Sequence, residues 1–297
     1  MGGFAKKSYN IHSKNRYMKI QSNCLLIFLI ALPNLIYAQF YLGASSSANI
    51  GVNGRSLQEF LLIDATVNQS AFENTLIEKK ASFGGGFLIS PLIGYQANKH
   101  IGFELQVGRY KTNTVSSTIT YNNPSDDKVS ISMSGKVFTI RPSIIGYIYK
   151  SKPLIYAKLG ANYSNCEFTT QTSRQKNQTQ TSILINGGQS LGISLGIGSE
   201  FSLTNRIYLR TELGYVHANY FPEKGTFTKY DVNGVNQLPN MSDKQKTIHY
   251  VKEGNVEQTY LGAALDAGTH LSPQIPISSF GLSIALIYKF NKRKTKS

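Results

Sequence analysis

Apolar residues at every second position are the feature of this sequence that most limits how the chain can fold. Residues 279–290, SFGLSIALIYKF, place large apolar side chains at the even positions and mostly Gly, Ser, Ala and Lys at the odd ones. Only a β-strand has side chains that alternate between two faces with a period of two. The segment therefore predicts a strand with one continuous apolar face, ending in aromatic residues, and one face of small side chains.

Seven further segments alternate in the same way, and the links between the eight segments alternate in length. The other segments lie near 40–50, 82–96, 101–121, 128–149, 154–170, 182–203 and 206–220. The short links lie around Asn98–His100, Lys150–Pro153 and Thr204–Asn205, and the longer ones near 51–81, 122–127, 171–181 and 221–276. Short turns at one end and long loops at the other are typical of an up-and-down barrel in an outer membrane.

The residues opposite the apolar face distinguish this barrel from a soluble β-sandwich. A sandwich has a solvated face rich in Lys, Thr and Glu, whereas these segments carry Gly, Ser and isolated charges, which suit a narrow barrel interior. Aromatic residues gather near the short-turn ends, as they do at lipid headgroups: Phe40, Tyr95, Phe103, Phe201, Tyr288 and Phe290. We predict an all-β fold, an eight-stranded antiparallel up-and-down transmembrane β-barrel with long extracellular loops. The alternative is a secreted sandwich or soluble barrel.

The first 38 residues have the features of an export signal. A basic start precedes an apolar run from Cys24 to Leu32 that is too short to span a bilayer, and Ala38 precedes the expected cleavage site. The alternative is a buried N-terminal helix. We predict a signal peptide over 1–38 with Met18 as a candidate translation start, a barrel domain over 39–290 and a basic periplasmic tail over 291–297. Only Cys166 then remains, which excludes an internal disulfide.

Several stretches resemble the outer membrane protein β-barrel domain family, also described as porin family or PorT-like proteins. They are the signal end IYAQF, the strands FGGGFLISPLIGYQ, SLGISLGIGSEFSL and RIYLRTELGY, and a last strand ending at Phe290. The resemblance implies a bacterial outer-membrane location. It also implies insertion by the β-barrel assembly machinery, which recognises a last strand that ends in an aromatic residue. Here NKRKTKS follows Phe290, so the aromatic residue is not C-terminal.

Seven charged residues point into the predicted barrel by the same alternation. They are Glu104, Arg141, Lys158, Glu200, Arg210, Glu212 and Lys289. Removing one partner of a buried ion pair costs roughly 3–5 kcal/mol of stability, so such charges need partners of opposite sign. We expect a salt-bridge network that fills the interior. The functional alternatives are a selectivity ring or gate for small solutes, and paired carboxylates for acid–base catalysis.

No catalytic or cofactor motif stands out, so we expect no enzymatic activity, no metal and no cofactor. No Cys or His falls at metal-ligand spacing, no Ser-His-Asp order is recognisable, and SFGGGF at 82–87 lacks the Lys-Ser/Thr pair of a phosphate loop. Ser272 near His270 is the one pair on which a hydrolase site could be imagined.

The net charge of +15 suggests nucleic acid, but its placement indicates lipid as the partner. Many basic residues lie at the short turns and in the tail, where anionic lipid attracts them. They are Lys99, Lys150, Lys152, Arg206, Lys292, Arg293, Lys294 and Lys296. We therefore expect contact with outer-membrane lipid and no binding of nucleic acid.

The long loops are where we expect function. Alternation runs on past a membrane-spanning length through TVSSTITYNN and KVSISMSG, and the segment 221–276 is longer than an ordinary connection. Tyr230, Tyr250 and Tyr260 are candidate contact residues. We hypothesise a closed or narrow lumen and a surface binding, adhesion or structural role through these loops, with an extracellular or periplasmic protein partner. The alternative is a small-solute porin or a secretion- or transport-associated component.

Overall fold

The computed structural model of the chain describes residues 39–52, 54–56, 63–68, 74–122, 127–148, 153–251 and 268–290. The predicted signal peptide with Met18, the basic tail 291–297 and Tyr260 lie outside these residues. Within the described ranges, no helix combines the length and the apolar character needed to cross a membrane.

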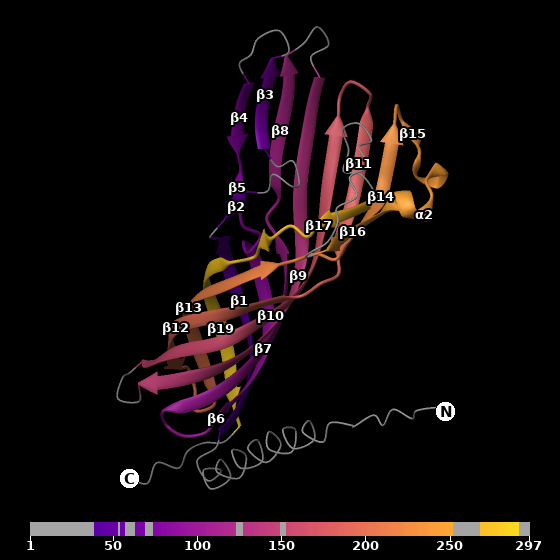
Figure 1. Cartoon of the computed structure of the whole chain (residues 1–297). Coiled ribbons are helices and arrows are strands. Elements are labelled where there is room, and N and C mark those ends of the chain that lie inside the picture. Colours follow the sequence, from indigo (N-terminus) through magenta and orange to yellow (C-terminus); the bar gives the residue numbers. More distant parts are fainter. Residues whose placement is uncertain are drawn as a thin grey trace, which may run out of the picture.

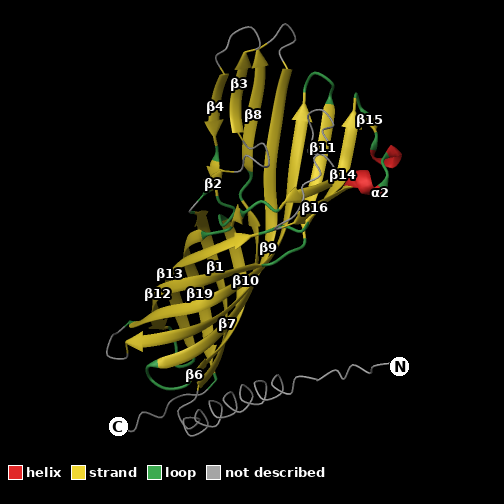
Figure 2. Ribbon diagram, viewed as in Figure 1, coloured by secondary structure: helices red, strands yellow, loops and turns green. Residues whose placement is uncertain are grey.

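Eight antiparallel strands close into a ring (Figures 1 and 2). In ring order they are β1 (Gln39–Gly51), β6 (Gly86–Gln96), β7 (Ile101–Thr112), β9 (Asp127–Ile148), β10 (Leu154–Arg174), β12 (Ser190–Ser202), β13 (Ile207–Tyr220) and β19 (Ser279–Lys289). β19 pairs with β1 over eleven residues and closes the ring. The predicted eight-stranded barrel is therefore confirmed.

The alternation in the sequence sets the two faces of the barrel wall. In β19 the even-numbered residues are exposed and most of the odd-numbered ones are buried, with Ile284 54% exposed and Ile287 fully buried. Cross-strand register aligns these faces, so that Leu195, Tyr215 and Phe280 follow one another on the outside. A continuous exposed apolar wall of this kind requires an apolar surrounding.

Short turns connect the strands at the end of the barrel where β1 begins and β19 ends (Figure 1). In the link between β6 and β7, the Asn98 side chain accepts hydrogen bonds from the backbone N–H groups of His100 and Ile101. In the link between β12 and β13, Thr204 Oγ1 accepts from Arg206 and Ile207 in the same way. In both of these turns a polar side chain thus satisfies backbone N–H groups of the same turn.

At the opposite end the same sheet continues beyond the barrel and opens out, and we call this part the extension (Figure 2). β9 and β10, with 22 and 21 residues, run without interruption from the barrel into it. The extension adds β3 (Ile63–Asn68), β4 (Asn74–Glu78), β8 (Val115–Asn122), β11 (Thr179–Asn186), β14 (Lys224–Val232), β16 (Thr247–Val251) and β17 (Gly268–Leu271). Smaller elements complete the chain: β2 (Arg55–Ser56), β5 (Lys80–Ala81), β15 (Val235–Asn236), η3 (Leu238–Asn240), α2 (Asp243–Lys246) and β18 (Ile275–Pro276).

The extension corrects several predicted boundaries. The segments 101–121 and 182–203 are each two strands, and 51–81, 171–181 and 221–276 contain strands rather than only loop. β11 turns odd-numbered residues inward, whereas β12 turns even-numbered residues inward. Gly187 and Gly188, both in the left-handed region at φ 73° and 70°, make the break between them.

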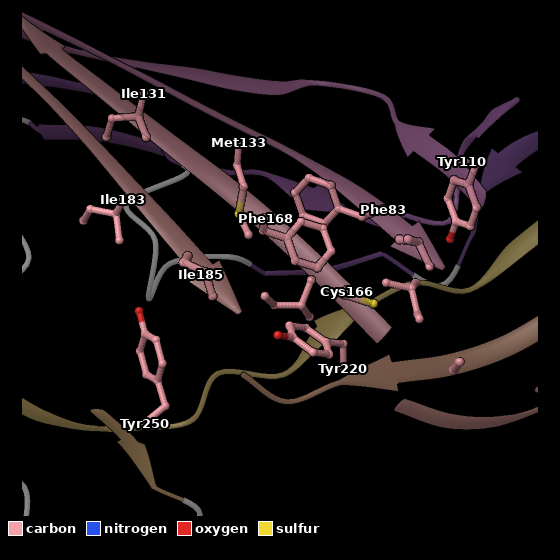
Figure 3. Packing of buried hydrophobic residues seen from close by; sticks show 14 of the residues in the cluster. Phe83, Tyr110, Ile131, Met133, Cys166, Phe168, Ile183, Ile185, Tyr220 and Tyr250 are labelled. Carbon is pink, nitrogen blue, oxygen red and sulfur yellow. The ribbon is translucent and has the colours of Figure 1, made fainter. Parts of the chain in front are cut away.

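An apolar cluster lies where the barrel meets the extension (Figure 3). Phe168 lies at its centre, with ring centroids 5.0 Å from Phe83 and 5.6 Å from Tyr220. Val137 in β9 and Cys166 in β10, at the end of the barrel next to the extension, are buried in the same cluster. The inward-facing side chains at this end of the barrel are therefore packed together.

Candidate functional site

Arg210 is the centre of an ion-pair network inside the barrel. Its Nη1 lies 2.6 Å from Glu104 Oε2 and its Nη2 lies 2.8 Å from Glu200 Oε2. The Arg210 side chain is 3% exposed. Glu200 is its direct cross-strand partner in the register of β12 and β13, so the fold itself sets one of these pairs.

The network extends from this centre in both directions. Lys158 Nζ lies 3.5 Å from Glu104 Oε1 and 2.7 Å from Glu212 Oε2. On the other side, Lys289 Nζ pairs with Glu200 Oε1. The order is Lys289, Glu200, Arg210, Glu104, Lys158 and Glu212, so that cations and carboxylates alternate along the network.

Inward-facing tyrosines complete the network, and the sequence reasoning did not assign them to it. Tyr41 donates to Glu104 Oε2 at 3.1 Å and Tyr156 donates to Glu212 Oε2 at 2.9 Å. The Arg210 guanidinium lies 5.3 Å from the Tyr41 ring and 4.9 Å from the Tyr156 ring. The parity of Tyr41 and Tyr156 along their strands is the signal that could have identified them.

Two glycines make room for these rings. A Cβ on Gly94 would lie 1.9 Å from Tyr41 Cζ, and a Cβ on Gly198 would lie 2.5 Å from the Tyr156 hydroxyl. Real Cβ atoms do not approach other atoms so closely. Glycine is therefore required at these two positions, because a tyrosine ring from the neighbouring strand lies over each of them.

Arg141 lies apart from the other six charged residues. Its Nε donates to Asn162 Oδ1 at 3.0 Å and to Thr139 Oγ1 at 3.3 Å, and none of the ion pairs described above includes it. A cavity of about 30 Å³ separates Arg141 from Lys158 and Glu212. A polar cavity of this size is large enough to hold water, so a small polar space remains in the interior beside the network.

The outer face of the extension presents rows of polar side chains. Cross-strand register places Ser116, Ser132, Gln171, Ser182 and Lys229 in one row across β8, β9, β10, β11 and β14. A second row runs parallel to the first and consists of Thr118, Ser130, Ser173, Gln180 and Asp231. These rows contribute to the lining of a groove of about 420 Å³. The groove is open, hydroxyl- and amide-rich, and carries little charge.

Two aspartates stabilise the extension by local contacts. Asp64 lies 2.9 Å from Lys79 Nζ and accepts a backbone N–H from Thr118, and these contacts lower the pKa of its carboxyl. Burial alone would raise the pKa of Asp127, but Arg174 at 2.6 Å and the backbone N–H of Lys176 lower it overall. Both groups therefore favour the ionised form.

The predicted loop tyrosines differ in exposure. Tyr230 is half-buried in β14. Tyr250 is only 8% exposed and belongs to the apolar cluster, with its pKa raised to about 12 by burial. The expectation that Tyr250 is a surface contact is therefore wrong, because β16 turns this ring toward the core.

No catalytic or metal centre emerges from the described residues. The Ser272 hydroxyl donates to the Pro222 carbonyl at 2.7 Å, which gives it a structural contact. His217 Nδ1 lies 3.2 Å from Ser278 Oγ, which also receives the backbone N–H of Ala218. In the described part of the chain, no three His, Cys, Asp or Glu side chains are placed to hold a metal ion.

Several solved structures are similar to this chain. OprG from Pseudomonas aeruginosa is 13% identical, with a TM-score of 0.44 and coverage of 86% of this chain and 97% of that one. Neisserial surface protein A is 16% identical, with a TM-score of 0.37 and coverage of 85% and 99%. The attachment invasion locus protein Ail of Yersinia pestis is 10% identical, with a TM-score of 0.32 and coverage of 85% and 97%. Similarities at this level carry no argument about function.

Among curated proteins no sequence match is found. The model of the family described as "Outer membrane protein beta-barrel domain" matches residues 38–238, which is more than half of the chain. This match agrees with the closed ring of eight strands and its exposed apolar wall. The chain therefore belongs to the outer membrane protein β-barrel domain family.

Proposed function

We propose that this protein is a closed outer-membrane β-barrel whose extension serves as a cell-surface binding module. The short-turn end then faces the periplasm and the extension faces the outside of the cell, as in outer-membrane barrels generally. Adhesion or another recognition role at the surface follows from this arrangement.

The single observation that carries the proposal is that the extension is built as a stable part of the molecule. β9 and β10 each run as one strand through both the barrel and the extension, and they pair with each other in both parts, with a two-residue gap at Arg141–Pro142. The apolar cluster adds a core of its own, with Phe168 and Ile185 fully buried. A rigid sheet on a membrane anchor is suited to presenting a binding surface, because its polar groups are already in position when a partner arrives.

The polar rows are the surface that we assign to the partner. Adjacent strands lie about 4.8 Å apart and alternate residues along a strand about 6.8 Å apart, so the two rows form a regular array of hydroxyl and amide groups. Ser132 and Gln171 are cross-strand partners near the middle of this array. A partner that presents uncharged hydrogen-bonding groups fits this surface best.

The groups that obstruct the interior argue against the small-solute porin alternative. The alternating ion pairs occupy one part of the lumen, and the apolar cluster occupies its outer end. Eight strands leave an interior that is only just wide enough for side chains. We expect planar bilayers containing the refolded chain to show no stable large channel. Frequent, long-lived conductance steps would favour the porin.

The binding proposal is tested on an array of glycans and extracellular-matrix proteins probed with the detergent-refolded chain. The variant carrying Ser132→Arg and Gln171→Arg places two bulky charges in the groove. The control carries Val235→Arg and Asn236→Arg in the exposed strand β15. We expect binding to at least one probe that the groove variant loses and the control keeps. Equal binding by both variants would contradict the assignment of the surface.

The alternative of a secretion- or transport-associated component predicts a different result. Such a component would act through partners in the periplasm or the membrane, so the groove variant would leave its phenotype unchanged. Loss of a secretion phenotype on substitution of the short turns, with the groove variant normal, would favour that alternative.

A further inference from the structure

A group of three basic residues lies on the outside of the barrel wall, at the end next to the extension. Lys111 in β7 and Lys136 in β9 are direct cross-strand partners. Arg109 lies on the same face of β7, two residues before Lys111, and all three are exposed. We call Arg109, Lys111 and Lys136 the basic cluster.

The cluster lies at the upper edge of the apolar wall. Arg109 stands between Ile89 and Phe138 in the cross-strand register, and these two side chains are 60% and 41% exposed. Phe87, 58% exposed, is the partner of Lys111. A strand needs about 9–11 tilted residues to cross a bilayer. Since β7 begins at Ile101, its ninth and eleventh residues reach the headgroups of the far leaflet.

The charges of the cluster are not balanced within the described part of the chain. Like charges directly opposite one another destabilise a sheet, yet Lys111 and Lys136 occupy such a pair. The acid in the same row is Glu167, at 4.0 Å from Lys136 Nζ, and both side chains are about half exposed. An exposed pair at this distance contributes little. Neither Arg109 nor Lys111 forms an ion pair with a described acid.

An apolar groove lies on the same wall, further from the extension. It has a volume of about 780 Å³ and runs from Leu105 and Pro142, at the end nearer the cluster, to Phe40 and Tyr95 near the short-turn end. Arg109 and Leu105 are four residues apart along β7, or roughly 14 Å at 3.4 Å per residue. That distance is within the reach of one acyl chain whose headgroup lies at the basic cluster.

We propose that the basic cluster binds the phosphate of an outer-leaflet lipid headgroup, with an acyl chain of the same lipid in the groove. Arginine binds phosphate through paired N–H donors, and lysine contributes a point charge. A phosphate bound between Lys111 and Lys136 would offset the repulsion between their two positive charges. Long basic side chains surrounded by Phe87, Ile89 and Phe138 can also extend to the headgroup level while their stems contact lipid.

The test uses the full chain refolded in detergent and a bisphosphorylated glucosamine-disaccharide lipid as the probe, measured by native mass spectrometry. The test variant carries Arg109→Gln, Lys111→Gln and Lys136→Gln. The control removes the same charge from the extension with Lys128→Gln, Lys224→Gln and Lys244→Gln. We expect the Kd for the lipid to rise at least tenfold in the test variant and less than twofold in the control.

Two further measurements keep the result decisive. Lys111→Glu places an acid opposite Lys136, which should support folding, and it must still weaken lipid binding. The same lipid with its phosphates removed must bind the wild-type chain as weakly as the test variant binds the intact lipid. Equal affinity for the two lipids, or equal affinity of test and control variants, would overturn the proposal. Displacement by an equal concentration of inorganic phosphate would show a free-anion site and would also overturn it.

Discussion

Replacing Arg210 by Met should destabilise the barrel strongly, because Arg210 lies at the centre of the network and joins the carboxylates of Glu104 in β7 and Glu200 in β12. The substitution keeps most of the side-chain volume but removes contacts of 2.6 Å and 2.8 Å to Glu104 and Glu200. Breaking a buried pair by removing one partner costs roughly 3–5 kcal/mol. Lys158 and Lys289 still face these carboxylates, so we expect about 3 kcal/mol.

The measurement is urea unfolding of the refolded chain in phospholipid vesicles, followed by far-ultraviolet circular dichroism and heat-modifiable gel mobility. The chain has no tryptophan, so fluorescence of that residue is not available as a probe. Arg206→Met is the matched control, because Arg206 is an exposed turn residue that donates to the Tyr288 hydroxyl. We expect it to change the free energy of unfolding by less than about 0.5 kcal/mol.

Adding Glu200→Gln to Arg210→Met tests the reasoning further. In the double variant, residue 200 no longer leaves a buried carboxylate without its arginine. Its loss in free energy of unfolding should therefore be smaller than the sum of the losses in the two single variants. Residues in one ion-pair network couple by about 0.5–3 kcal/mol. A folded Arg210→Met variant within about 1 kcal/mol of the wild type, or strictly additive losses, would refute the view that the network holds the interior together.

Three other predictions follow from the wall, the interior and the extension. Ile284→Arg should lower the free energy of unfolding by roughly 2–4 kcal/mol, and Phe290→Arg, near the short-turn rim, by only about 0–1 kcal/mol. Equal losses for the two variants in vesicle unfolding would contradict the lipid-facing wall. Gly94→Ala should push the Tyr41 ring away from its position at a cost of about 1–3 kcal/mol, measured by the same unfolding. Because contacts lower the pKa of Asp127, its contribution is full above the unfolded pKa of about 3.9 and is lost as pH falls through the lower folded value. Protease protection of the end of the extension, where β9 begins and β10 ends, should therefore differ between wild type and Asp127→Asn at pH 6, and the difference should shrink as pH falls below about 3.9.

The barrel could be predicted from the sequence because one physical requirement acts along every strand. Each residue faces either lipid or a narrow interior, so parity assigns it to one side. Parity alone placed Glu104, Glu200 and Arg210 inside the barrel. Parity does not fix where each side chain lies along the barrel axis. For that reason it could not show that Arg141 donates a hydrogen bond to Asn162 rather than to a carboxylate.

The extension could not be predicted to the same extent, because the membrane does not determine which face of its strands is apolar. The apolar residues stay at odd positions on both sides of Asn113–Thr114 and of Gly187–Gln189. They face outward in β7 and β12 but inward in β8 and β11, so the sequence does not mark where these strands meet. The parallel pairings of β3 with β8 and of β16 with β17 join segments far apart in the chain. No local pattern encodes such pairings, and Tyr250 was misplaced for this reason.

The continuity of β9 and β10 has a mechanical consequence for the proposed surface. Eighteen paired positions join these two strands from the barrel to the tip, with Tyr156 in the lumen and Gln171 in the polar row on the same strand. A sheet transmits displacement along its strands because its hydrogen bonds and its packed side chains resist shear. A partner bound at the polar rows would therefore act on a body already fixed to the membrane, and binding would cost little ordering of the chain. The ion-pair network in the lumen serves the same end, since a barrel whose strands are joined through its interior gives the extension a fixed base.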